Sequence, residues 1–374
     1  MENNLDVLQI LAELVAIPSV NPSYEGGVPE AAVGEYVERF CATHGIETFR
    51  QDVLPGRFNV IARLPGQRPE RRVVLEAHMD TVSVNGMTIP PFTPEIREGK
   101  LYGRGSCDTK AGLAGMLHAL ATVKASGVMP PCEIWLAAVV DEEYSFRGVV
   151  KLCEGLQAHA AIVAEPTEMR LVTASKGVLR WRMRTRGKAA HSAKPHLGVN
   201  AISLMADVIQ ALDQHTKTLA ARSHPLLGPA TLNIGMIHGG EQINFVPDVC
   251  EIAIDRRLIP GEDAETVWEE YARLAAELGA EIDRPLLADG PLETPVDSDA
   301  VHAAQRVMVG LGRPVAAVGV PFGSDASKLA RQGVPSIIFG PGSIDRAHAA
   351  VEYVECDQVQ EAATFFRQFI LEFV

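Results

Sequence analysis

Five short apolar segments constrain the fold of this chain more than any other feature. They are Phe58–Arg63, Arg72–Ala77, Glu133–Val140, His159–Ala164 and Ser336–Phe339. Short runs rich in β-branched residues are typical of strands buried on both faces, as in parallel sheets. Between them, Thr109–Ser126 carries apolar residues at helical spacing. Strands that alternate with helices predict an α/β domain with a mixed, largely parallel sheet flanked by helices.

The middle of the chain has a different pattern. In Val178–Arg186, apolar residues alternate strictly with four arginines, which indicates a half-exposed antiparallel strand. A helical pattern at 197–215, strands at 230–237 and 249–256, a helix at 263–278 and a strand near 281–283 follow. This βαββαβ order predicts a ferredoxin-like α+β unit that buries its own core. We therefore expect a domain at 175–290, inserted into a larger domain made of residues 1–174 and 291–374.

Composition excludes several classes of function. The chain has 34 Lys and Arg against 47 Asp and Glu, a net charge of −13, which argues against nucleic-acid or membrane partners. The four arginines of 178–186 lack interleaved aromatic residues, so we expect a solvated or subunit-facing surface there. The N-terminus has no basic start, and the longest apolar run, 134–140, is too short to span a bilayer. The six cysteines are scattered without a Cys-x-x-Cys pair, which predicts free thiols and a cytoplasmic location.

Acidic and histidine residues follow the predicted strands at the points where these strands end. They are His78 and Asp80, Glu142 and Glu143, Glu165, and further on His348. A further acid, Asp108, precedes the helix at 109–126. Because the carboxyl ends of parallel strands meet at one edge of a sheet, these groups should gather there. Their negative charges would repel one another unless a cation neutralises them, and oxygen and nitrogen ligands suit zinc, cobalt or manganese.

Two local patterns suggest separate roles within this group. Asp80 can accept a hydrogen bond from the imidazole nitrogen of His78 that does not bind metal. Glu142 and Glu143 are adjacent, so their side chains should diverge, and one can bind metal while the other faces a substrate. The chain has no Gly-x-Ser-x-Gly, Walker or His-Glu-x-x-His motif, which disfavours serine hydrolase, nucleotide-dependent and single-zinc protease functions.

Several motifs resemble those of a known family, in order and over nearly the whole chain. They are Ile17–Pro22, His78–Val82, Leu101–Gly112, Asp141–Glu143, Ala164–Thr167, His191–Pro195 with Gly198–Ala201, Asn244–Pro247, Gly340–Gly342, Ala347-His348 and Glu352–Val354. Together they resemble the zinc-dependent amidohydrolase and peptidase family of acetylornithine deacetylase, succinyl-diaminopimelate desuccinylase, aminoacylase and carboxypeptidase G. One departure is Val351, where many members of that family have an acid.

This resemblance implies two divalent metal ions, with zinc expected and cobalt or manganese as alternatives. The implied ligands are His78 and Glu165 for one ion, Glu143 and His348 for the other, and Asp108 as the bridge between them. Asp80 would support His78, and Glu142 would be the general base. The nucleophile would be a water molecule activated by the metal.

The resemblance also implies roles for the inserted domain as a lid and as the interface of a homodimer. His191 would reach the active site of the partner subunit, while Asn244 and Arg257 would hold the carboxylate or carbonyl of the substrate. Without the resemblance, His191 would be interpreted as a surface histidine and Arg257 as an exposed arginine at a strand end.

These observations predict an enzyme that hydrolyses the amide bond of an N-acyl amino acid. A dipeptidase or carboxypeptidase acting on short peptides is the nearest alternative. A protein that binds metal or amino acids without catalysis is the alternative from another class, and the presence of Glu142 beside the predicted ligands argues against it.

Overall fold

The computed structural model describes residues 5–374, which form two compact units. Unit 1 contains the chain up to Thr173, then Thr294–Val318 and Ser324–Val374. Unit 2 contains Ala174–Glu293 together with Gly319–Gly323. The last segment, which sequence analysis assigned to the larger domain, belongs to unit 2, where Gly319 lies against Leu226 and Leu227.

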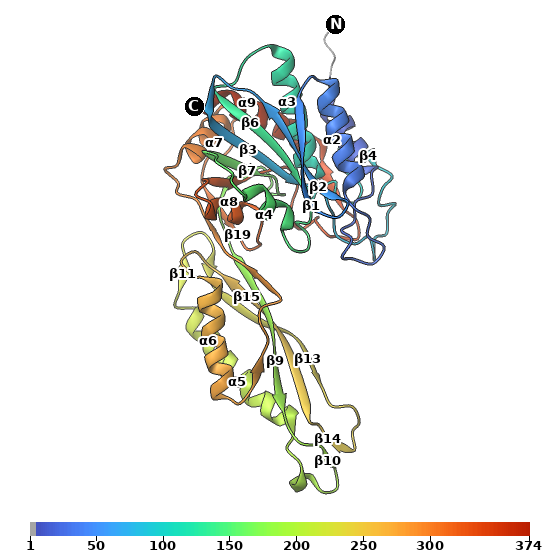
Figure 1. Cartoon of the computed structure of the whole chain (residues 1–374), viewed down its shortest axis with the longest axis vertical. Helices are drawn as coiled ribbons and strands as arrows, with labels where there is room; N and C mark the ends of the chain where they lie inside the picture. Colours follow the sequence, from blue (N-terminus) through green and yellow to red (C-terminus); the bar gives the residue numbers. More distant parts are fainter. Residues whose placement is uncertain (1–4) are drawn as a thin grey trace. The chain divides into compact units, whose positions relative to one another are not determined.

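The core of unit 1 is a mixed sheet (Figure 1). Six neighbouring strands, in spatial order, are β1 (Glu47–Leu54), β2 (Arg57–Leu64), β6 (Cys132–Val139), β3 (Arg68–His78), β7 (Ala160–Val163) and β20 (Ser336–Ile338). β6, β3, β7 and β20 run parallel to one another. The predicted parallel centre of the sheet is therefore confirmed.

The predicted direction of segment 58–63 is wrong. This segment forms β2, which pairs antiparallel with both β1 and β6. β1 and β2 are joined by a tight turn at Pro55 and Gly56, where Gly56 has a φ of 73°, and so short a connection permits only an antiparallel pair. β2 is nevertheless buried on both faces, which is why its composition is that of a parallel strand.

Helices cover both faces of this sheet. The main core joins alternate strand residues, such as Val73, Leu75 and Ala77, to helices α1 (Val7–Val15), α2 (Ala31–Thr43), α3 (Lys110–Ser126), α7 (Asp299–Gly310) and α9 (Cys356–Glu372). The helix predicted at 109–126 is therefore confirmed. Two short helices, α4 (Arg147–Cys153) and α8 (Ala326–Arg331), contact the strands as well. Because side chains alternate along a strand, His78 points away from the face that carries Ala77.

Unit 2 has the predicted βαββαβ order. Its sheet runs β13 (Thr231–Gly239), β15 (Val249–Leu258), β9 (Gly177–Arg186) and β16 (Glu281–Ile282), with every pair antiparallel. Helices α5 (Ala201–Leu219) and α6 (Ala264–Glu277) share a core with Leu179, Trp181 and Met183 of β9. A further strand, β17 (Leu287–Asp289), also pairs with β9. Pro285 separates β16 from β17 because proline has no N–H for the ladder.

The arginines of β9 are paired with carboxylates of neighbouring strands and loops. These pairs are Arg180 with Asp255, Arg182 with Glu251, Arg184 with Glu251 and Asp283, and Arg186 with Glu281. The basic stripe seen in the sequence is therefore balanced by acidic partners. All six cysteines are free, as predicted, and all are buried. Among residues 5–374, no helix combines the length and hydrophobicity that crossing a membrane requires.

Candidate metal centre

Three of the five predicted ligands, His78, Glu143 and Glu165, lie at or just after the ends of parallel strands. His78 is the last residue of β3, Glu142 and Glu143 follow β6, and Glu165 follows β7. His78 and Glu165 are buried, with exposed fractions of 2% and 5%. His348 lies beyond β20 in a left-handed backbone conformation with a φ of 60°, which is uncommon for a residue other than glycine.

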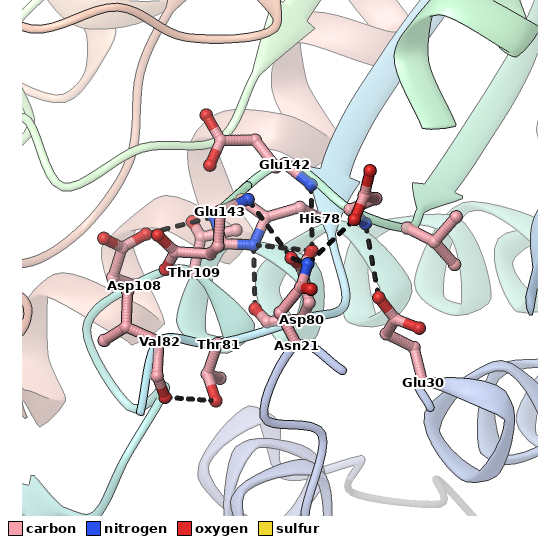
Figure 2. Close-up of polar contacts among 12 residues, drawn as sticks. Asn21, Glu30, His78, Asp80, Thr81, Val82, Asp108, Thr109, Glu142 and Glu143 are labelled. Carbon is pink, nitrogen blue, oxygen red and sulfur yellow. Dashed lines mark hydrogen bonds and ion pairs between the residues drawn. The ribbon is translucent and has the colours of Figure 1, made fainter. Parts of the chain in front are cut away.

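Asp108 lies between two imidazole rings. Its Oδ1 atom is 3.1 Å from Nε2 of His78, and its Oδ2 atom is 3.2 Å from Nε2 of His348. The same nitrogen of His348 is 3.2 Å from Oε2 of Glu143. A carboxylate that offers one oxygen to each of two imidazoles has the arrangement that a ligand bridging two metal ions requires. Residues far apart in the sequence thus form a single cluster (Figure 2).

Two groups of potential ligand atoms overlap at His78. One contains His78, Asp108 and Glu143, and the other contains His78, Glu142 and Glu165. Within each group, one ligand atom per residue lies within 4.8 Å of the others. The second group brings Glu142, the predicted base, close to the predicted ligands of one metal ion.

The pKa shifts of the carboxyl groups in this cluster are those expected of a site that binds cations. Burial, with repulsion from neighbouring acids, raises the pKa of Glu142 and Glu165 well above the usual range, although the charge of His78 opposes the shift. Burial and the charge of Asp108 raise the pKa of Glu143 to about 7. Each shift means that a buried negative charge is unfavourable here unless positive charge is added. Oxygen and imidazole donors in this number suit zinc, cobalt or manganese.

Asp80 has a different set of contacts from the one expected. Nδ1 of His78 is 2.9 Å from the main-chain oxygen of Asp80, whereas the nearest carboxylate oxygen is 3.7 Å away. The carboxylate instead accepts hydrogen bonds from the main-chain N–H groups of Glu142 and Glu143, both at 3.1 Å. Figure 2 shows Asp80 beneath this turn. Its side chain therefore supports the base and a ligand rather than the imidazole.

The loop that carries Asp108 is held by Glu352. One carboxylate oxygen of Glu352 accepts hydrogen bonds from the main-chain N–H groups of Cys107 and Asp108, at 3.0 and 3.1 Å. The other oxygen accepts a hydrogen bond from Arg104 at 2.5 Å. Glu352 immediately precedes β21 (Tyr353–Glu355), which pairs with β5 (Lys100–Tyr102). The Glu352–Val354 motif was apparent in the sequence, but this role required the strand pairing.

The three remaining predicted residues lie in unit 2. His191 is exposed on β10 (Ala190–His191), opposite Phe245 of β14 (Phe245–Val246). Asn244 is also exposed, and its main-chain oxygen accepts a hydrogen bond from Ser192, so it lies beside His191. Arg257 lies on β15 and donates to Asp255 at 2.7 Å. The first two thus share one paired segment, while Arg257 has a carboxylate partner within its own strand.

Comparison with known proteins identifies the family. Residues 74–372 match Peptidase family M20/M25/M40. The chain belongs to this family. As an M20 protein it is a metal-dependent hydrolase, which confirms the expected reaction class.

Its relatives have several different activities. An acetylornithine deacetylase of Myxococcus xanthus is 30% identical, over 96% of this chain and 95% of the relative. A probable succinyl-diaminopimelate desuccinylase of Staphylococcus epidermidis is 27% identical, over 94% of each chain. Among solved structures, a tripeptidase of Staphylococcus aureus has a TM-score of 0.80 and 23% identity, and covers 97% of this chain and 96% of its own. The similarity to the tripeptidase is one of fold, and it extends over nearly the whole of this M20 chain.

Proposed function

We propose that this M20 hydrolase removes the acyl group from an N-acyl amino acid. The proposal rests on one observation above all: Asp108 offers its two oxygens to the imidazoles of His78 and His348, while Glu142 lies within 4.8 Å of ligand atoms of His78 and Glu165. The acetylornithine deacetylase and desuccinylase names of the relatives support this substrate class. Cleavage of a di- or tripeptide is the same reaction on a different acyl group, and the experiment described below distinguishes it from deacylation.

The residues of this cluster would have the following roles in the reaction. His78 and Glu165 would hold one divalent ion, His348 and Glu143 the other, and Asp108 would bind both. When bound, such ions polarise a carbonyl group and acidify water. Glu142 would accept a proton from the attacking water as oxygen adds to the amide carbon. The same carboxyl group would deliver that proton to the leaving nitrogen as the C–N bond breaks, which yields a carboxylic acid and a free amine.

Replacing the base tests this proposal. Glu142→Ala should lower kcat by about 100- to 10,000-fold, the usual contribution of a general base, and leave the metal content nearly unchanged. Glu154→Ala, at an exposed surface position paired with Lys151, is the control and should keep full activity.

The wild type would be assayed with N-acetylornithine, N-succinyl-diaminopimelate and simple dipeptides, each with zinc, cobalt or manganese. No hydrolysis of any of them would favour a binding protein, and activity on dipeptides alone would favour a peptidase.

We also infer that the chain forms a homodimer through unit 2. β13 is at the end of its sheet, and its apolar residues Met236 and Ile237 are exposed. Ile243 and Phe245 are exposed as well. An edge strand with exposed apolar side chains is a template for pairing with another strand. Light scattering after size-exclusion chromatography should give a dimer mass for the wild type and a monomer mass for Ile237→Glu. A monomeric wild type would contradict the inference.

A further inference from the structure

A buried asparagine outside the predicted set contacts the support of the base. Asn21 has no exposed surface, and neither have Asp80 and Asp141. Its Nδ2 atom donates to Oδ2 of Asp80 at 2.7 Å and to Oδ1 of Asp141 at 3.0 Å. A side-chain amide has two N–H donors, and both of these donate to carboxylates. Figure 2 shows Asn21 directly beside Asp80.

The two carboxylates differ in what else holds them. Asp141 has strong partners of its own: Arg57 at 3.0 Å, Arg147 at 2.6 Å and the hydroxyl of Ser145 at 2.7 Å. Among the described residues, Asp80 forms an ion pair with His78 at 3.7 Å. Its hydrogen bonds come from the main-chain N–H groups after β6 and from Asn21. Asn21 thus connects a carboxylate held by two arginines to one whose ion pair, with His78, is longer at 3.7 Å.

The position of Asn21 is itself well defined. Its main-chain N–H donates to Thr81 at 2.9 Å, and the N–H of Thr81 donates to Ser19 at 3.0 Å. Its Oδ1 atom accepts a hydrogen bond from the N–H of Ser23 at 3.0 Å, which closes a local turn. The side chain therefore cannot shift without breaking contacts on both sides.

We propose that Asn21 is a positioning residue that holds the Asp80 carboxylate in the orientation that places Glu142 and Glu143. The inference rests on the function proposed above, because it gives Glu142 and Glu143 their roles. Without the Asn21 donor, Oδ2 of Asp80 loses the shorter of its two hydrogen bonds and keeps only the one from the main-chain N–H of Glu143, so the carboxylate is held less firmly. The main-chain N–H groups of both glutamates then bond an acceptor that is less firmly held, and the base and one metal ligand are less well positioned.

Two substitutions separate this role from a local structural one. Asn21→Asp keeps the size and the Oδ1 acceptor of the turn at Ser23, but removes both donors. Asn21→Ala removes the acceptor as well. Because the aspartate also places a carboxyl group beside Asp80 and Asp141, the alanine variant is the decisive one. If Asn21 served only the local turn, Asn21→Ala would lower the melting temperature but keep wild-type metal affinity and kcat. Asn59→Asp is the matched control, because Asn59 is fully buried in the same unit and bonds Gly148 and Val140 without contacting Asp80.

The experiment measures metal affinity, kcat, KM and the melting temperature for each variant. We expect Asn21→Ala and Asn21→Asp each to weaken binding of the second Co²⁺ ion by about 10- to 100-fold in a titration against a chelator. Each should lower kcat by a similar factor with KM within about threefold. Asn59→Asp should lower the melting temperature but not the metal affinity. The loss in Asn21→Ala/Asp80→Asn should be no larger than in Asp80→Asn alone, because both changes act through the same carboxylate.

The outcomes distinguish this inference from the proposed function. Wild-type metal affinity and kcat in Asn21→Ala would overturn it, and so would fully multiplicative losses in the double variant or an equal loss of affinity in Asn59→Asp. A wild type that binds two ions but hydrolyses no amide would overturn the function alone. The Co²⁺ titration would still decide the role of Asn21.

Discussion

Replacing Gly112 with alanine should displace the loop that carries Asp108. Gly112 is in the first turn of α3, and a Cβ atom added there would lie 2.4 Å from Cβ of Ala164, the residue before Glu165. Ordinary contacts of this kind measure 3.4–4 Å, so the helix and the strand end would have to separate by roughly 1 Å. The hydroxyl of Thr109 also donates to the main-chain oxygen of Ala164 at 2.9 Å and would be strained by the same shift.

Two magnitudes follow from this displacement. An extra carbon in a closely packed site costs about 1–3 kcal/mol of folding free energy. A misplacement of about 1 Å at a catalytic site can cost roughly 100-fold in rate. Because Asp108 and Glu165 lie on opposite sides of this contact, Gly112→Ala should also weaken metal binding. Urea denaturation, a metal titration and kcat/KM would measure the three effects.

Gly115, one turn further along α3, provides the control. A Cβ atom there would lie 3.2 Å from the ring of Phe366, which needs to yield by only a few tenths of an ångström. Gly115→Ala should therefore change stability by less than about 1 kcal/mol and leave metal affinity unchanged. If Gly112→Ala were folded and kept wild-type activity and affinity, the close approach to Ala164 would not determine the geometry of the site.

Two further predictions concern buried charges. Glu352→Gln removes one partner of the buried Glu352–Arg104 pair, so it should lower the free energy of unfolding by about 3–5 kcal/mol and weaken metal binding through Asp108. Urea denaturation would measure the loss of stability. An Arg104→Gln/Glu352→Gln variant as unstable as the sum of the two single variants would contradict this prediction. Burial raises the pKa of Glu133, but hydrogen bonds from Arg63 and Arg72 outweigh that effect and lower it overall. The stabilisation from this carboxylate is therefore present above its unfolded pKa of about 4.3 and lost as the pH falls through the lower folded value. Glu133→Gln should reduce stability at pH 7 and flatten its decline in acid, and equal acid slopes in urea denaturation of both proteins would refute this.

The sequence alone was enough to locate the chemistry of this protein. His78, Glu142, Glu143 and Glu165 stand at or just after the ends of apolar strands, while Asp108 precedes a helix and His348 follows the last strand after a loop. Strand character is a local property of composition. Parallel strands bring their carboxyl ends to one edge whatever the details of packing. This is why His78, Asp108, Glu143 and His348 could be expected near one another before any coordinates, and the same reasoning predicted the βαββαβ order of unit 2.

Only the tertiary structure decided which atoms hold these residues in place. The amide of Asn21 bonds carboxylates 59 and 120 positions away in the chain, and no local pattern encodes such a pairing. Asp80 was expected to bond the nearby imidazole, but the turn after β6 presents two main-chain N–H groups to it. The direction of β2 likewise depended on its hairpin and not on its composition. The composition of a segment indicates whether that segment is buried. The hydrogen-bond partners of its residues depend on which other segments fold beside it.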